Sequence, residues 1–542
     1  MMNGSRINTK IICSLATGLL LALSWPARGF PFLAFVAFIP LFFVEANLLK
    51  QSKEKRSIVF FLYAWVAFFV FNLLTTWWIL FATIPGMIVA VILNAIFMAI
   101  PWWLMHLGRR ILPGNQGLLS IIFLWLSFEF LHARWEVSWS WLDLGNVFAA
   151  FPAWVQWYDT TGTAGGSLWV LIINILLFST IKDYLETRII NKKNLTGVVL
   201  AVVLFVVPAI ISFVKWHSYE EHLDPVEVVI VQPAEDPYDP VYSHSELRDR
   251  VAHIIALADE QITPDTRFVV APEGANPRGI WLHDAEEHYT VQRLREHVSE
   301  NPGLVWVMGS FMYELFGPGD TLPPEARPLQ NDNRYYVAYN SIIFVEEGQP
   351  LQYYHKSKLV PGIERMPYFR LLRPVGRLVD RFGGISGSLG THDKRLVYVT
   401  ETGHQVGAAV CYESIYGDFM AGYVRGAAGL LFIATNDGWW RNTPGYRQHN
   451  QYARLRAIEL RRSIARSAST GISSFINQKG EITQSTNWWK ADAMVAELNV
   501  NNKITFFAAR GNFLGRLSVF LTAFFLLYMI SQSQIRKTGR NT

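Results

Sequence analysis

The distribution of apolar residues constrains this chain more than any other feature of its sequence. Long apolar runs crowd into roughly the first 215 residues, and one more lies near the C-terminus. Each run is close to the ~20 residues that a helix needs to cross a bilayer. The expected spans are Ile11–Trp25, Phe30–Leu48, Ile58–Ala82, Ile84–Leu107, Leu118–His132, Gly165–Ile181, Leu195–Phe213 and Phe513–Ile530. The sequence therefore predicts eight membrane-spanning helices, with a long polar segment between the seventh and the eighth.

The lysines and arginines predict the orientation of these spans, because basic residues in short loops stay on the cytoplasmic side. In the short loops and chain ends around the spans, most of these basic residues fall on one side: Arg6, Lys10, Lys50, Lys53, Lys55, Arg56, Arg109, Arg110, Lys182, Arg188, Lys192, Lys193, Arg536, Lys537 and Arg540. The short loops of the opposite side offer little beyond Arg28 and Arg134. We therefore expect both termini in the cytoplasm and the polar segment across the membrane.

The composition excludes several other classes of protein. With 51% hydrophobic and only 17% charged residues, the chain is neither a single soluble globule nor disordered. A net charge of +5 is too dilute over 542 residues to predict nucleic acid as the main partner. The two cysteines, Cys13 and Cys411, cannot form a disulfide scaffold or a four-cysteine metal site. No metal or nucleotide signature is present, so we expect no cofactor.

The segment between the last two spans has a different pattern, with short β-branched runs alternating with polar helical stretches. The strand candidates are VEVVIVQP, TRFVVAPE, LVWVMGS, YNSIIFVEE, QVGAAVCYE, LLFIATND, SSFINQKGEI and AMVAELNV, and Val291–Glu300 and Gln448–Arg466 are the clearest helices. This order predicts an α/β domain with its own core. We expect a transmembrane domain over residues 1–215, a catalytic domain over 216–510, and an eighth span with a cytoplasmic tail over 511–542.

Cys411 is the first candidate for chemistry, because it ends an apolar strand just before an expected helix. A thiolate there would face the positive end of the helix, which lowers a thiol pKa and can bind an oxyanion. Lone cysteines are more often small buried core residues. An exterior, oxidising location favours the functional interpretation, since the only other cysteine lies in a predicted span.

Two further residues gain meaning from their order relative to Cys411. Glu273 ends the strand in VVAPEGANP, and Lys356 lies in HKSKLVPGIERMP, eight residues before Glu364. Singly, each is an ordinary cap or surface residue. The order strand-glutamate, lysine and strand-cysteine resembles the nitrilase superfamily, whose acid, lysine and cysteine occur in this order at strand ends.

The resemblance is closer to the apolipoprotein N-acyltransferases, the membrane-embedded branch of that superfamily, and it covers nearly the whole chain. The matching motifs are SWSWLDLGNVF, GTAGGSLW, VVAPEGANP, YNSIIFVEEG, HKSKLVPGIERMP, CYESIYGDF, ATNDGWW, RQHNQYARLRAIELRR, ARSASTGISSFINQKGEI and FFAARGNFLGRLS. The resemblance implies an α-β-β-α sandwich facing the periplasm, attached to eight spans in the bacterial inner membrane. It also implies a monomer that takes an acyl chain from a phospholipid and transfers it to the N-terminal cysteine amine of a diacylglyceryl lipoprotein.

The family's residue roles carry over by position. Glu273 would be the general base, Cys411 the nucleophile that forms a thioester, and Lys356 the group that stabilises the oxyanion. The supporting residues implied by the resemblance are Glu364, which orients the lysine, Tyr412 and Glu413 beside the nucleophile, and Asn340.

Some positions depart from the family's pattern or leave alternatives open. Ala234 stands roughly where the family has an asparagine, and Gly362-Ile363 reverse the usual bulky-then-glycine order in the segment Pro361–Lys394, which is expected to be a lid. The candidates for the aromatic or acyl-binding positions are Tyr238, Tyr242, Trp439 and Trp440. His449 favours a structural role, and Glu129, the acid well inside a span, is either functional or a hydrogen-bonding partner.

Two other functional classes are compatible with the same membrane spans and outer α/β domain. The first is a membrane-tethered nitrilase-type amidase, in which water replaces the amine acceptor. The second is a transport or lipid-binding protein whose outer domain has lost its chemistry. The spans contain few of the charged residues that an ion path needs, and the triad of Glu273, Lys356 and Cys411 is complete. Both of these classes are therefore less favoured than the acyltransferase.

Overall fold

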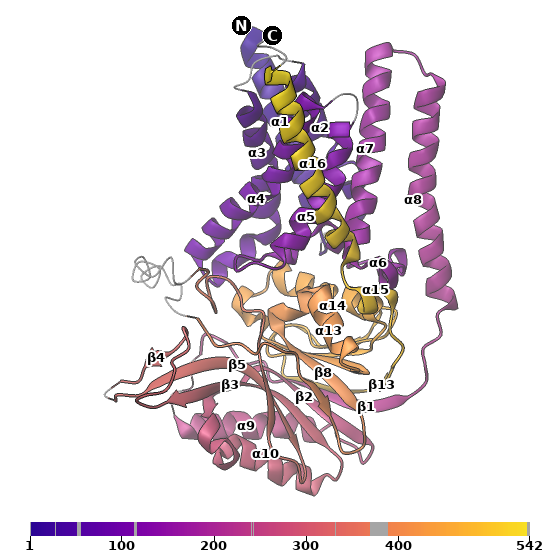
Figure 1. Ribbon diagram of the computed structural model, residues 1–542. Helices are drawn as coiled ribbons and strands as arrows, with labels where there is room; N and C mark the ends of the chain where they lie inside the picture. Colours follow the sequence, from indigo (N-terminus) through magenta and orange to yellow (C-terminus); the bar gives the residue numbers. More distant parts are fainter. Residues whose placement is uncertain are drawn as a thin grey trace. The chain divides into compact units, whose positions relative to one another are not determined.

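The computed structural model describes residues 2–27, 29–50, 56–112, 116–239, 241, 243–330, 332–368 and 388–538 (Figure 1). The chain forms two compact units. The first consists of Met1–Leu80, Ile84–Ser218 and Arg510–Thr542, and the second of Tyr219–Ala509 together with Phe81–Thr83. Three residues from the turn between two apolar helices therefore pack with the second unit, which no sequence pattern indicated.

The first unit is helical. Its main helices are α1 (Met2–Ser24), α2 (Ile39–Leu49), α3 (Arg56–Thr76), α4 (Ile84–Ile111), α5 (Gln116–His132), α7 (Thr163–Thr187), α8 (Lys192–Ser218) and α16 (Phe513–Thr538), with the short α6 (Tyr158–Thr161) before α7. Among the described residues, six helical segments are long and apolar enough to cross a membrane, not the eight expected. The other two expected spans are the shorter apolar helices Thr9–Ser24 and Gln116–His132. The first of these belongs to α1, which has 23 residues in all, and the second is α5, which has 17.

Two buried acids in this unit bond to neighbouring side chains or to the backbone, as an apolar environment favours. Glu45 accepts from Arg109 and lies 2.8 Å from the Nδ1 atom of His106. Glu129, the acid inside a predicted span, accepts from the Trp125 indole at 2.7 Å and from the Leu144 backbone N–H at 2.8 Å. These contacts give Glu129 a structural role in holding the loop after α5.

The second unit contains two sheets. The first has the order β13-β1-β2-β3-β5-β4, with β6 paired to β5, and the second has the order β12-β11-β10-β9-β8-β7. The strand bounds are β1 (Pro225–Gln232), β2 (Thr266–Trp281), β3 (Val305–Phe316), β4 (Arg327–Pro328), β5 (Tyr335–Glu346), β6 (Gln352–His355), β7 (Val397–Val399), β8 (Gln405–Val410), β9 (Leu430–Thr435), β10 (Ile464–Ala468), β11 (Ser474–Ile476), β12 (Ile482–Ser485) and β13 (Asp492–Asn499). The central strands of each sheet are parallel: β1, β2 and β3 in the first, and β8, β9 and β10 in the second.

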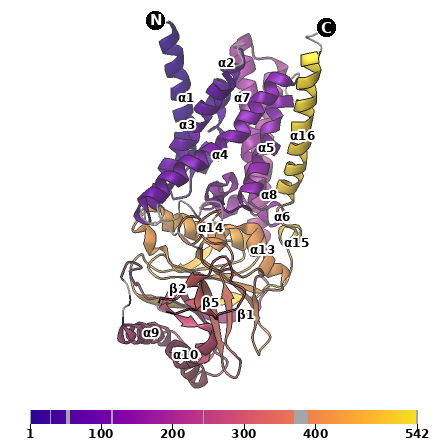
Figure 2. The ribbon, with the colours of Figure 1, turned by 60° about the vertical axis from the view of Figure 1, so that its left-hand side comes forward.

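Helices cover the outer face of each sheet, so this unit is an α-β-β-α sandwich (Figure 2). The helices α9 (His244–Asp259) and α10 (Tyr289–Glu300) pack on the first sheet, and α13 (Gly417–Arg425) and α14 (Pro444–Leu460) pack on the second. A continuous apolar core joins α9 and α10 to the first sheet. The two sheets meet through contacts such as the Phe268 and Phe432 rings, whose centroids are 5.2 Å apart. The last short helix is α15 (Phe506–Arg510).

The helix expected over Gln448–Arg466 is shorter than its periodicity suggested. It ends at Leu460, because Arg461 takes a left-handed conformation with φ of 50°. The chain then enters β10, which is buried on both faces and pairs with β9 and β11. Strands buried on both faces lack the alternation that reveals a strand in sequence, which is why β10 was missed.

Candidate active site

Three candidate residues lie in or immediately after strands of the sandwich. Glu273 is part of β2, Lys356 follows β6 directly, and Cys411 follows β8 directly. All three are buried, with 8%, 1% and 6% of their surface exposed. The Lys356 backbone N–H donates to the Asn340 carbonyl at 2.8 Å, which ties the lysine loop to β5.

The acids and the lysine form a closed network. The ammonium of Lys356 lies 2.8 Å from Glu364 Oε1 and 3.4 Å from Glu273 Oε1. The amide of Asn340 donates to the same two oxygens, at 2.7 Å to Glu273 and 2.9 Å to Glu364. The second oxygen of Glu273 accepts from the Asn436 backbone N–H at 3.0 Å. Two donors from different strands therefore fix both carboxylates, and the lysine lies between them.

The charge on Lys356 follows from this geometry. Burial alone lowers the pKa of its ammonium, but the negative charges of Glu364 and Glu273 outweigh burial and raise that pKa above its ordinary value. The lysine is therefore a fixed buried cation near Cys411, whose thiolate charge would raise the same pKa further.

Cys411 lies at a sharp turn. It has φ of 50°, in the left-handed region that residues other than glycine seldom adopt, and it opens the 3-10 turn Cys411–Ile415 before α13. Backbone strain of this kind costs about 1–3 kcal/mol and persists where the surroundings hold it in place. A turn of this shape directs the side chain at a strand end away from the strand axis.

The thiol pKa differs from the sequence expectation. We expected a helix N-terminus to lower it, but burial and the charge of Glu273 raise the pKa of the Cys411 thiol well above its ordinary value, against the opposing charge of Lys356. The segment after Cys411 is a short 3-10 turn rather than a long helix, so its dipole is weak. At rest the sulfur carries its proton, and a nucleophilic role needs a base.

Glu413 connects the nucleophile turn to the lysine loop. It is fully buried and accepts four hydrogen bonds, from the backbone N–H groups of Ser357, Lys358 and Val410 at 2.6, 3.0 and 2.9 Å and from the Tyr354 hydroxyl at 2.8 Å. Tyr412 is also buried, and its hydroxyl accepts from Tyr416 at 2.8 Å. These bonds make Glu413 a positioning residue that holds Lys356 and Cys411 in one frame.

A second buried cluster supports Cys411 from the other side. Asp437 lies 2.7 Å from the Arg466 guanidinium and 2.9 Å from His449 Nδ1. His449 Nε2 is 3.1 Å from the Ser414 hydroxyl, which donates to the Cys411 carbonyl at 2.7 Å. Burial lowers the pKa of His449. Burial acts to raise the pKa of Asp437, but Arg466 and His449 outweigh it, so the pKa of this acid lies below its ordinary value. These contacts fit the structural role predicted for His449. Asp437 and Arg466 were not predicted, and their signal in the sequence is an acid two residues after β9 and an arginine within β10.

The aromatic candidates lie in different places. Tyr238 and Trp439 are 44% and 40% exposed, their ring centroids are 5.2 Å apart, and the Tyr238 hydroxyl donates to the Phe81 carbonyl at 2.7 Å. Trp440 packs against His449 instead, with ring centroids 5.7 Å apart. Tyr242 lies outside the described residues. Tyr238 and Trp439 therefore share one exposed surface, and Trp440 belongs to the cluster behind Cys411.

Comparison with known families gives this geometry a context. Residues 228–503 match the carbon-nitrogen hydrolases, and residues 17–176 match the apolipoprotein N-acyltransferase N-terminal domain. The chain belongs to the carbon-nitrogen hydrolase family. Together with the N-terminal match, this places it among the apolipoprotein N-acyltransferases of the nitrilase superfamily.

Curated relatives agree along almost the whole chain. The apolipoprotein N-acyltransferase of Chlorobaculum tepidum is 28% identical over 93% of this chain and 94% of its own. That of Geobacter metallireducens is 25% identical over 92% of this chain and 91% of its own. Among solved structures, a nitrilase-superfamily protein of Saccharomyces cerevisiae is 17% identical over 53% of this chain and 93% of its own, with a TM-score of 0.36.

Two departures from the family pattern have visible local consequences. Ala234, near the position of the family's asparagine, has φ of 58°, which asparagine adopts more readily than alanine. Gly362 has φ of 82° in the turn that brings Glu364 to Lys356, and its N–H donates to the Arg365 carbonyl at 2.7 Å. Of the expected lid, residues 369–387 lie outside the described residues. Within the described part of the chain, no group of three or more His, Cys, Asp or Glu side chains is arranged to hold a metal ion.

Proposed function

We propose that this acyltransferase works through a thioester on Cys411, with Glu273 as the base and Lys356 as the oxyanion-stabilising cation. The observation that carries the proposal is the convergence of these groups. Lys356 contacts Glu273 directly, and the charges of both residues act on the Cys411 thiol. The raised pKa of that thiol supports an acid–base partner, because the sulfur becomes a nucleophile only when a neighbour removes its proton.

In the first half-reaction, the proton of the Cys411 thiol passes to Glu273 while the sulfur attacks the ester carbonyl of a phospholipid. The tetrahedral oxyanion forms beside the Lys356 ammonium, which Glu364 and Asn340 help to hold in place. The carbon–oxygen bond to the glycerol then breaks, and Glu273 returns its proton to the leaving alkoxide. The products are a lysophospholipid and an acyl thioester on Cys411.

In the second half-reaction, the N-terminal amine of a diacylglyceryl-cysteine attacks the thioester carbonyl. Glu273 accepts a proton from the amine, the carbon–sulfur bond breaks, and the proton returns to Cys411. An amide forms on the lipoprotein and the enzyme regains its free thiol. Each substrate leaves a product before the next one reacts, so the kinetics are ping-pong.

We further propose that the chain crosses the bacterial inner membrane eight times, with both termini in the cytoplasm and the catalytic unit in the periplasm. The segregation of lysine and arginine supports this orientation. Of the two shorter apolar segments, one belongs to α1, which has 23 residues, and the other is α5, whose 17 residues are near the lower limit for a span. Both substrates are lipids, so a membrane anchor confines the search to two dimensions.

Intact-protein mass spectrometry tests the mechanism. Purified protein incubated with phosphatidylethanolamine should gain the mass of one acyl chain, which peptide mapping should assign to Cys411. The Cys411→Ser variant should gain no thioester, whereas the Cys13→Ser control should load like the wild type. An acyl chain on any other residue, or loading that survives the removal of Cys411, would refute the mechanism. Net hydrolysis of a soluble amide in place of transfer to an acceptor would favour the amidase.

A further inference from the structure

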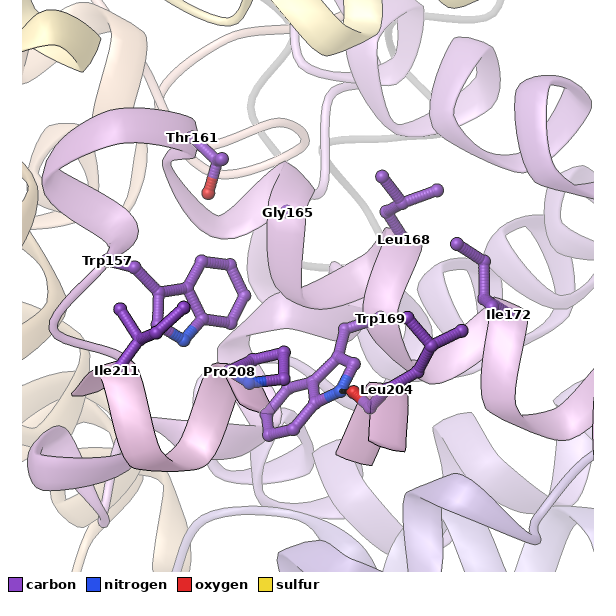
Figure 3. Close-up of a pocket in the computed structure, with 9 residues that line it drawn as sticks. All are labelled: Trp157, Thr161, Gly165, Leu168, Trp169, Ile172, Leu204, Pro208 and Ile211. Carbon is purple, nitrogen blue, oxygen red and sulfur yellow. Dashed lines mark hydrogen bonds between the residues drawn. The ribbon is translucent and has the colours of Figure 1, made fainter. Parts of the chain in front are cut away.

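The first unit contains an apolar cavity of about 320 Å³ between α7 and α8. Its volume is near the lower end of the range for small-molecule sites, about 300–1,000 Å³. Figure 3 shows side chains from both helices and from the turn before α7 pointing toward it. The lining residues are Trp157, Thr161, Gly165, Leu168, Trp169, Ile172, Leu204, Pro208 and Ile211. All nine belong to the first unit, whereas the reacting groups belong to the second.

The helices on either side of the cavity are joined by a specific bond. Pro208 has no backbone N–H, so the carbonyl of Leu204 lacks its usual donor within α8. The Trp169 indole of α7 supplies that donor at 2.7 Å. Most of α8 is otherwise exposed, including Val202 and Val206. The two helices are therefore joined at this bond, and side chains do not fill the space beside it.

One polar group in the cavity wall has no partner. The indole Nε1 of Trp157 is buried and makes no hydrogen bond among the described residues. It faces Pro208 and Ile211 of α8 (Figure 3). A buried N–H without an acceptor is costly, and in a wall that is almost entirely apolar Thr161 supplies the one side-chain hydroxyl among the nine lining residues. The missing group is an acceptor attached to an apolar ligand.

A cation lies beyond the same end of the cavity. Lys215 is one helical turn past Ile211 on α8, and its ammonium is 2.7 Å from Asp159. The lysine remains 38% exposed. Trp216, the next residue, is of the type that favours the membrane–water interface. Along α8, the cavity wall ends at Ile211, where the Trp157 N–H faces the helix, and the partly exposed Lys215, which is ion-paired with both oxygens of Asp159, follows one turn later.

We propose that this cavity holds one acyl chain of a bilayer phospholipid, separate from the lipid that reacts. The ester carbonyl accepts the Trp157 N–H, and the phosphate lies near Lys215. The order of groups along a phospholipid, from acyl chain through ester to phosphate, is the order of the three features along α8. The bound lipid fills the gap between α7 and α8 and stabilises their pairing.

Native mass spectrometry of the full chain tests the site. The protein is reconstituted in vesicles of phosphatidylethanolamine and phosphatidylglycerol, extracted in mild detergent, and examined for retained phospholipid. Ile211→Trp fills the cavity, and its control is Ile210→Trp, a neighbouring exposed position that does not line it. We expect the wild type and Ile210→Trp to retain one phospholipid that Ile211→Trp lacks. Equal retention by the two variants would overturn the proposal.

A second variant separates ligand binding from folding. Trp157→Phe keeps an aromatic ring but removes the donor, and we expect phospholipid retention to weaken roughly three- to tenfold. Its control is Trp154→Phe, because Trp154 packs on Phe32 and does not line the cavity. Both variants should still load acyl chains on Cys411. Unchanged retention by Trp157→Phe would refute the role of the indole N–H even if Ile211→Trp fails to fold.

Discussion

Glu364→Gln tests whether the buried lysine depends on two carboxylates. Glutamine has nearly the shape of glutamate and its oxygen still accepts from Asn340, but its amide nitrogen cannot accept from the Val360 N–H that Glu364 Oε2 accepts at 2.8 Å, so the substitution removes a charge and one backbone hydrogen bond. In the wild type, Lys356 contacts Glu364 at 2.8 Å and Glu273 at 3.4 Å, and both raise its pKa against the effect of burial. Without Glu364, burial is opposed mainly by one carboxylate, so the pKa of Lys356 must fall.

The size of this fall follows from the separation of the charges. An opposite charge within about 4–6 Å shifts a pKa by roughly one to three units, which is about 1.4–4 kcal/mol. A raised lysine pKa keeps the cation charged through the neutral range, and the charge is lost only as the pH rises through that pKa. The variant should therefore lose acyl loading at an alkaline pH that the wild type tolerates. Near neutral pH its loading should be about 10- to 100-fold slower, because the cation is also held less firmly.

The assay is the rate of thioester formation on Cys411 as a function of pH, followed by intact mass. The matched control is Glu347→Gln, because Glu347 is exposed and directly follows β5. This variant should leave the dependence of the loading rate on pH unchanged. A variant that merely loosens the fold would load slowly at every pH without a displaced alkaline limb. Identical profiles for Glu364→Gln and the wild type would refute the assignment of Glu364 as the residue that holds the lysine charged.

Three further substitutions test the frame around the site and the membrane unit. Asp437→Asn leaves Arg466 buried without its anion and should destabilise the second unit by about 3–5 kcal/mol in denaturant unfolding. Its control, Asp332→Asn in an exposed pair with Arg334, should leave the unfolding midpoint unchanged. Gly309→Ala places a methyl group 2.3 Å from the Pro272 carbonyl oxygen and 2.6 Å from the Glu273 Cα. The substitution should lower the free energy of unfolding by about 1–3 kcal/mol and, by displacing Glu273, slow the acyl loading of Cys411. An unchanged loading rate would contradict this packing. Trp169→Phe removes the donor to the Leu204 carbonyl and should lower thermal stability by about 1 kcal/mol, a loss that Pro208→Ala should reverse by restoring the backbone N–H.

Much of the fold was predictable because its signals are local. The strand candidates around Glu273 and Cys411 correspond to β2 and β8, since continuous β-branched runs between turn residues indicate buried strands. The family resemblance was also correct. Six of the eight expected spans are long apolar helices among the described residues, and the other two expected spans fall on Thr9–Ser24 of α1 and on the 17-residue α5.

The remaining features depend on contacts between distant residues. Asn340 and Glu364 converge on Lys356 only because β5, β6 and the following turn fold back on one another. Asp437 and Arg466 are 29 positions apart and meet because β9 and β10 are parallel neighbours. The direction of the Cys411 pKa shift was wrong because burial, which sequence does not reveal, outweighs the dipole of a short turn. No sequence pattern separates Trp157 from the other tryptophans.

The most direct test of the thioester pathway is a pulse-chase experiment on a single turnover. The enzyme is loaded from phosphatidylethanolamine with an isotope-labelled acyl chain, the donor is removed, and a diacylglyceryl-cysteinyl peptide is added. We predict that the label leaves Cys411 and appears on the peptide amine at the same rate and in equal amount. Label that reaches the peptide while Cys411 is never acylated, or that remains on Cys411 while unlabelled product forms, would contradict the pathway.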